Sequence, residues 1–138
     1  MIPIYKLVHS MANKQRREFD RITYDKPYSA AQARILNYLL DHSTQEIFQK
    51  DIEQEFDLRP PSATSLLQSM EKSGLIRRET STADARFKRI VCSESAYSYN
   101  EQISRSLADL TQKLSRNISP ADLETWRKVT IQIINNLE

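Results

Sequence analysis

The chain has 138 residues, with one Gly, one Cys, two His and a formal net charge of +2. This composition excludes glycine-rich phosphate loops, a Cys/His zinc site and an internal disulfide, and so few glycines disfavour a hairpin-rich fold. No apolar run is long enough to span a bilayer and the first 14 residues lack a signal-peptide layout, so we expect a cytoplasmic, mainly helical protein with no membrane partner, metal or cofactor.

Two helices are predicted in the first third of the chain. Apolar residues at helical spacing indicate a first helix from about Ile4 to Tyr24, which Pro27 ends. Ser29 and Gln32 have the spacing of a capping box, in which each side chain pairs with a backbone N–H of the other residue. A second helix therefore begins there and ends near residue 42.

A short helix, a turn and another helix come next. The third helix covers about residues 50–56, and the Pro60-Pro61 pair ends it and opens a fourth helix that runs to about Ser73. Gly74 stands where a helix end favours a left-handed residue. Residues 75–80 and 87–92 then predict a β-hairpin. This order of elements is a winged helix-turn-helix.

The last third of the chain is predicted to be helical. A long fifth helix spans about residues 94–117, and a sixth begins at Ser119-Pro120. The fifth helix carries a four-three-four apolar seam, typical of helices that pair with other helices. The seam is formed by Ile103, Leu107, Leu110 and Leu114.

The outer face of the fourth helix has small, neutral, hydrogen-bonding side chains and no acid. A helix in the major groove of DNA needs such side chains, because they allow close approach and contact base edges. A plain surface helix is the alternative, although surface helices usually carry Glu and Lys. The predicted DNA-binding residues of this helix are Pro61, Ser62, Thr64, Ser65, Gln68 and Ser69.

Positive charge is concentrated between residues 59 and 92, a segment that contains seven basic and three acidic residues. An Arg at a hairpin tip can enter the minor groove, and other cations can neutralise phosphates. Asp84 lies two residues from Arg86 and can orient its guanidinium, or form only a solvated ion pair with it. The predicted DNA-binding residues of the hairpin are Arg77, Arg78, Asp84, Arg86, Lys88 and Arg89.

Three sequence motifs carry a family resemblance. They are Ser-Ala-Ala-Gln-Ala-Arg-Ile-Leu from Ser29, Met-Glu-Lys-Ser-Gly-Leu-Ile-Arg-Arg from Met70, and Asp84-Ala-Arg86. With them the chain resembles the MarR family of bacterial transcriptional regulators over essentially its whole length. It departs from the family pattern at Cys92, Ser93 and Ala96, and in the Pro60-Pro61 pair.

The resemblance implies a homodimer that binds double-stranded DNA at a palindromic operator. Residues 27–92 would form the DNA-binding lobe, and residues 1–26 and 93–138 the dimerisation helices. The apolar faces of these helices fit that role, although part of each must serve the chain's own core.

Such regulators are usually repressors released by a small ligand, an oxidant or a metal. Cys92 is expected to be a buried, inert thiol, and His9 and His42 supply too few ligands for a metal. A small aromatic or apolar effector remains. The candidate pocket residues, each of which core packing also explains, are Met11, Phe19, Tyr24 and Tyr38.

Two other classes of protein fit the sequence less well. No catalytic motif or phosphate loop points to an enzyme. A winged-helix adaptor that binds protein without sequence-specific DNA binding is the alternative, and it would carry an apolar or acidic recognition face. The neutral face and basic hairpin of this sequence favour the DNA-binding regulator.

Overall fold

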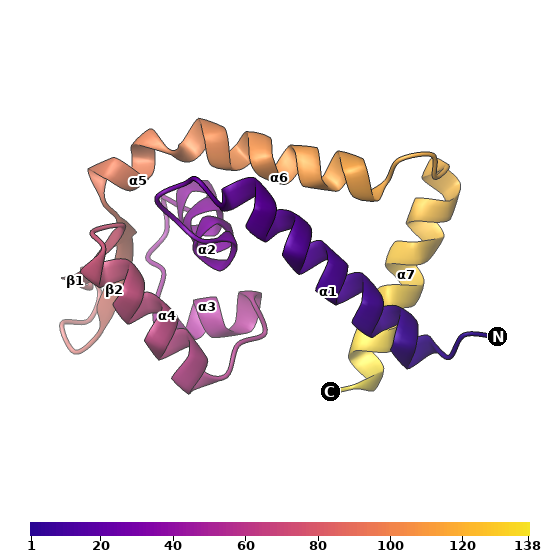
Figure 1. The fold of residues 1–138 in the computed structure, drawn as a ribbon. Helices are drawn as coiled ribbons and strands as arrows, with labels where there is room; N and C mark the ends of the chain where they lie inside the picture. Colours follow the sequence, from indigo (N-terminus) through magenta and orange to yellow (C-terminus); the bar gives the residue numbers. More distant parts are fainter. The chain divides into compact units, whose positions relative to one another are not determined.

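The computed structural model describes all residues, 1–138, and is mainly helical with one antiparallel hairpin, which confirms the predicted fold class. The chain divides into two compact units, residues 1–106 and 107–138. No helix has the length and hydrophobicity needed to cross a membrane. The elements, in chain order, are α1 (Ile4–Thr23), α2 (Ala30–Asp41), α3 (Gln49–Glu55), α4 (Pro60–Lys72), β1 (Ile76–Thr80), β2 (Lys88–Cys92), α5 (Glu94–Ser98), α6 (Asn100–Leu114) and α7 (Pro120–Asn136) (Figure 1).

Helix α2 begins at the predicted capping box and supplies much of the core of the first unit. Ser29 Oγ accepts the backbone N–H of Gln32 at 3.2 Å, and the Gln32 side-chain oxygen accepts the N–H of Ser29 at 2.9 Å. Ile35, Leu36 and Leu39 on one face of the helix are buried. This face lets α2 pack against both α1 and β2.

Helices α3 and α4 form the helix-turn-helix. Pro60 and Pro61 occupy the first turn of α4, where a missing N–H costs no helical hydrogen bond. Ala63, Leu67 and Met70 are fully buried, and α4 packs against α3 and β1. Because three buried residues fix one side of α4 to the lobe, its opposite side faces outward.

The hairpin follows directly from the end of α4. Gly74 has a φ of 77°, which lets the chain reverse as predicted. β1 and β2 pair from Ile76 opposite Cys92 to Thr80 opposite Lys88. The N–H of Ile90 also donates to the carbonyl of Ile47 at 2.7 Å, so the segment before α3 lies beside β2.

The single helix predicted over residues 94–117 is wrong in one respect, because it is interrupted at Tyr99. There the backbone leaves the regular helix, and the N–H of Tyr99 bonds back to the carbonyl of Ala96 at 3.1 Å. The Tyr99 ring lies 5.5 Å from that of the buried Tyr28, whose hydroxyl donates to Gln102 at 2.7 Å. Docking on Tyr28 accompanies the interruption and gives α5 and α6 in place of one helix.

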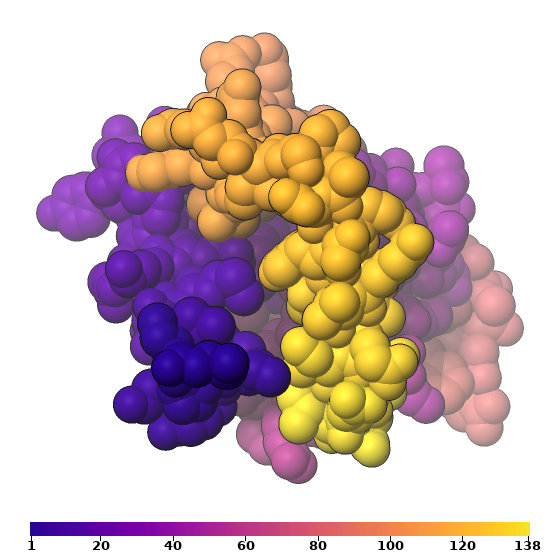
Figure 2. Space-filling view, turned by 90° about the vertical axis from the view of Figure 1, so that its right-hand side faces the viewer, coloured from indigo at the N-terminus to yellow at the C-terminus, as the bar shows by residue number.

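Two helices expose apolar faces. Helix α7 (yellow in Figure 2), capped by Ser119, has no buried residue. Its exposed apolar side chains are Trp126, Val129, Ile131 and Ile134, and those of α1 include Ile4, Leu7, Val8 and Met11. Exposed apolar residues in such numbers are typical of protein–protein interaction surfaces.

Candidate nucleic-acid interface

The outward face of α4 carries the six side chains singled out in the sequence. Thr64 is half-buried and the other five, Pro61, Ser62, Ser65, Gln68 and Ser69, are exposed. They are short and uncharged, apart from the longer amide of Gln68. This surface lets a polyanion approach closely and offers hydroxyl and amide groups for hydrogen bonds.

Gln49, which sequence reasoning missed, fixes one of these hydroxyl groups. Its side-chain nitrogen donates to Thr64 Oγ1 at 2.9 Å and to Glu53 at 3.1 Å. Because the Thr64 oxygen accepts from Gln49, its own hydrogen is free to donate outward. Nothing in the sequence links two residues 15 positions apart on different helices.

At the hairpin tip, Asp84 holds Arg86. Its carboxylate accepts the backbone N–H of Arg86 at 3.0 Å, Nε at 3.1 Å and Nη2 at 2.7 Å. These bonds lower the pKa of Asp84 and raise that of Arg86. Phe87 lies beside the pair, with its ring centre 5.8 Å from the guanidinium carbon of Arg86. An exposed cation is thus presented in a fixed direction.

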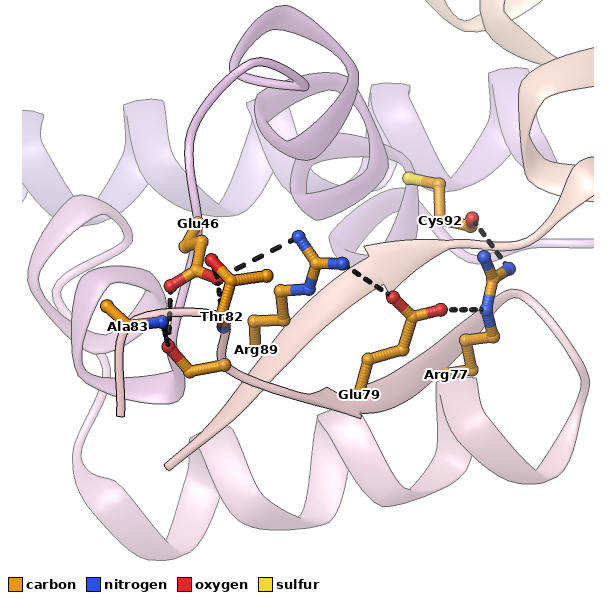
Figure 3. Close-up of polar contacts among 8 residues, drawn as sticks. Glu46, Arg77, Glu79, Thr82, Ala83, Arg89 and Cys92 are labelled. Atoms are coloured by element: carbon orange, nitrogen blue, oxygen red, sulfur yellow. Dashed lines mark hydrogen bonds and ion pairs between the residues drawn. The ribbon is translucent and has the colours of Figure 1, made fainter. Parts of the chain in front are cut away.

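Two further arginines of the hairpin share Glu79. Its carboxylate oxygens lie 2.8 Å from Arg77 Nε and 3.0 Å from Arg89 Nη2 (Figure 3). The hydrogen bond from Arg77 is the main cause of a lowered pKa at Glu79. Arg77 also donates to the carbonyl of Cys92 at 3.3 Å. The positive charge of this pair is therefore partly offset within the hairpin.

The remaining two cations differ from each other. Arg78 forms a longer ion pair with Glu71, at 3.6 Å. Lys88 donates to the hydroxyl of Thr80 at 2.8 Å and has no carboxylate partner. Arg86 pairs only with Asp84, two residues away in the same loop, and Lys88 bonds only to the hydroxyl of Thr80. These two are thus the hairpin cations with the fewest ion pairs to other parts of the lobe.

Glu46, in the loop between α2 and α3, was not singled out from the sequence. It accepts the Ser81 hydroxyl at 2.6 Å, and the N–H and hydroxyl of Thr82 at 2.7 Å and 2.8 Å. Arg89 lies between Glu46, at 3.8 Å, and Glu79 (Figure 3). The Ser81 and Thr82 bonds lower the pKa of Glu46 to about 2, so it is a carboxylate at neutral pH.

The four predicted effector residues are not gathered around one cavity. Met11 and Tyr24 are exposed, Phe19 is buried, and Tyr38 packs against His42 and Phe56. An open cavity of about 420 Å³ lies between the end of α1 and the start of α2, and only Tyr24 of the four lines it. Its other lining residues include Asp20, Thr23, Lys26, Tyr28 and Gln32.

Metal and thiol chemistry find little support in the side-chain arrangement. No three His, Cys, Asp or Glu side chains are grouped so that they could hold a metal ion. Cys92 is buried, and burial raises the pKa of its thiol to about 11. A thiol with so high a pKa is protonated at neutral pH and is a poor nucleophile.

Comparison with known proteins finds one family model and several solved structures that resemble this chain. The model of the MarR family matches residues 27–86, and no curated protein matches the chain significantly. The transcription regulator MarR from Oenococcus oeni PSU-1 superposes with a TM-score of 0.87 at 23% identity, covering 96% of this chain and 99% of that one.

A second solved structure was determined with DNA. The MepR–DNA complex of S. aureus superposes with a TM-score of 0.92 at 20% identity, covering 99% of this chain and 97% of MepR. The regulator SlyA reaches a TM-score of 0.87 at 15% identity, covering 99% and 94% of the two chains. At these identities the structures share the fold of this chain.

Proposed function

We propose that the chain, whose residues 27–86 match the model of the MarR family, is a member of that family and a homodimeric, sequence-specific DNA-binding repressor of the cytoplasm. The observation that carries this proposal is the outward face of α4 together with the basic hairpin whose strand β1 packs against α4. A neutral, hydrogen-bonding helix face stands next to a hairpin whose exposed Arg86 is held by Asp84. The DNA complex of MepR, which has the same fold, supports this use of the surface.

Helix α4 lies in the major groove in this proposal. Gln68 has the amide that pairs with adenine, and Thr64 donates the hydroxyl hydrogen that Gln49 leaves free. Ser62, Ser65 and Ser69 contact base edges or phosphates. Pro60 and Pro61 lack the backbone N–H that often binds phosphate at a helix start, so side chains provide these contacts.

The hairpin contacts the minor groove and the flanking phosphates. Arg86 enters the groove, where the potential is most negative, and Lys88 neutralises a phosphate. The other phosphate contacts come from Arg77, Arg78 and Arg89. The positive charge of these arginines is partly neutralised by the carboxylates of Glu79 and Glu71.

Dimerisation uses the exposed apolar faces. The stripe on α1 and the unburied helix α7 are supported as dimer surfaces by their size and by the lack of buried residues along α7. We assign residues 27–92 to DNA binding and residues 1–26 and 93–138 to dimerisation. Two copies of α4 about 34 Å apart then read the two halves of a palindrome.

Release by a small aromatic or apolar effector completes the proposal. The open depression beside Tyr24, of about 420 Å³, is the candidate place for such a molecule. Tyr24 is the predicted effector residue that lines this cavity, and Met11, Phe19 and Tyr38 lie outside it. An effector that binds one spacing of the two lobes better than the other shifts the dimer away from its DNA-binding form.

Fluorescence anisotropy of a DNA fragment from upstream of the protein's own gene tests this function. We expect this fragment to bind more tightly than scrambled DNA, with two chains per site and a preference that survives raised salt. Equal and steeply salt-dependent binding to both DNAs would contradict sequence-specific recognition. Absence of binding to either would favour the adaptor.

A further inference from the structure

We propose that Glu46 is a positioning residue for DNA binding, which anchors the hairpin loop and thereby sets the orientation of Arg86. This inference rests on the proposed function. Glu46 itself makes no contact with Arg86, and it lies 35 residues before Ser81, its first partner in the hairpin. Its effect on Arg86 must therefore pass through the loop of residues 81–87.

The first step is the junction between Glu46 and the start of that loop. Three donors from two consecutive residues, Ser81 and Thr82, converge on one carboxylate. Ionised carboxylates only accept hydrogen bonds, and they accept several at once, so Glu46 suits this set of donors. Ser81 is buried, which makes its hydroxyl costly to leave without a partner.

The Ser81 hydroxyl connects Glu46 with the backbone of Ala83 and Asp84. It donates to Glu46 and accepts the N–H of Ala83 at 3.1 Å and of Asp84 at 3.3 Å. One donor and two acceptor positions are thus all in use. Because Glu46 takes the hydroxyl hydrogen, the oxygen lone pairs point at the two amides, and the turn that begins the loop is fixed.

The last step runs from Asp84 to Arg86. The carbonyl of Asp84 accepts the N–H of Phe87 at 3.1 Å, and the carbonyl of Phe87 accepts the N–H of Ser81 at 2.9 Å, which closes the loop. The Asp84 carboxylate then holds the Arg86 guanidinium. A continuous series of hydrogen bonds thus connects the loop before α3 with the cation at the hairpin tip.

Whether DNA affinity rises or falls when Glu46 is neutralised distinguishes a positioning role from simple charge repulsion. An acid close to a phosphate-binding surface repels DNA, so neutralising it should tighten binding if its charge were all that mattered. Loss of the anchor should instead weaken binding, because Arg86 must then be ordered when DNA binds. Glu46→Gln removes the charge, keeps the size and places an amide NH₂ against donors, so the two effects oppose each other.

Glu55→Gln is the matched control. Glu55 is exposed at the end of α3, has no hydrogen-bond or ion-pair partner, and its replacement removes the same unit of charge. We expect Glu55→Gln to bind operator DNA as tightly as the wild type or slightly more so. Glu46→Gln should bind about tenfold more weakly, the effect of one lost charge-assisted hydrogen bond.

Ser81→Ala is the second variant, since it breaks the series without changing any charge. We expect it to weaken DNA binding by a similar factor, and the Glu46→Gln/Ser81→Ala double variant to be less affected than the product of the two single effects. It also provides the test if Glu46→Gln fails to fold, which circular dichroism would reveal.

Hydrogen exchange of the Thr82 amide reports on the anchor without DNA. We expect Glu46→Gln to accelerate this exchange and Glu55→Gln to leave it unchanged. If Glu46→Gln binds DNA as tightly as Glu55→Gln, the positioning role is overturned while the proposed function stands. If the wild type itself does not bind DNA, the proposed function fails and this role fails with it.

Discussion

Replacing Arg86 with Ala tests the hairpin assignment most closely. The change removes the exposed guanidinium and leaves Asp84 without the three hydrogen-bond contacts that the Arg86 side chain makes to it. The hairpin tip thus goes from a neutral ion pair to a lone carboxylate. Both consequences oppose DNA binding, while the proposed dimer surfaces on α1 and α7 are untouched.

The size of the effect follows from counting charges. Each phosphate charge neutralised adds about 0.9 to the slope of log affinity against log salt, and a dimer carries two copies of Arg86. Arg86→Ala should therefore make the slope shallower by about 1.8. Between about 50 and 200 mM salt, the affinity ratio of wild type to variant should then shrink roughly twelvefold.

Fluorescence anisotropy across a salt series measures this slope, and sedimentation checks that Arg86→Ala is still a dimer. Asp84→Asn is the companion variant, because it keeps the cation but weakens its anchor. Its slope should match that of the wild type, and its affinity should fall although a negative charge has been removed. An Arg86→Ala variant with the wild-type slope would refute the contact between Arg86 and DNA.

Four further outcomes are expected. Gln68→Ala should relax sequence preference by about 1–3 kcal/mol at one base pair per half-site, as measured with an operator panel, and an equal loss on all sequences would count against base contacts. Leu67→Ala, at a fully buried position of α4, should lower the free energy of unfolding in urea by about 2–5 kcal/mol, and a loss below about 1 kcal/mol would contradict the packing of that face. The pKa of Glu46 is lowered from 4.5 to about 2, so the stability that its carboxylate contributes is present above pH 4.5 and is lost as the pH falls toward 2. The difference in unfolding free energy between wild type and Glu46→Gln should therefore shrink over that pH range. A difference that stays constant would contradict this linkage. Cys92, buried and with a pKa of about 11, should resist iodoacetamide at about pH 8 in the folded protein and react once the protein is unfolded, as mass spectrometry would show; rapid labelling of the native protein would contradict its burial.

Local signals in the sequence were sufficient for most element boundaries. The capping box at Ser29, the prolines at the start of α4 and the positive φ of Gly74 all lie where residue type alone placed them. Each depends on chemistry within one helical turn. The exposed face of α4 was equally predictable from the sequence, because the apolar residues Ala63, Leu67 and Met70 mark the buried side opposite it.

Features that depend on distant residues were not accessible in this way. No Gly or Pro marks the interruption at Tyr99 in the sequence. The ring that packs against Tyr99 belongs to Tyr28, which lies 71 positions earlier. Glu46 looked like one acid among several in a negatively charged segment, and its bonds to Ser81 and Thr82 cross the lobe. Glu79 likewise gave no sign that it offsets two of the hairpin arginines.

In the proposed dimer, two copies of α4 and of the hairpin recognise a palindromic DNA sequence. Selection of binding sites from random-sequence double-stranded DNA by the full-length wild-type protein tests it directly, because the selection assumes no operator sequence. We expect enriched sites with two inverted half-sites whose centres are about 10 base pairs apart, and weaker enrichment of the same sites by Arg86→Ala. Recovery of unenriched sequence, or of a single half-site bound by one chain, would contradict it.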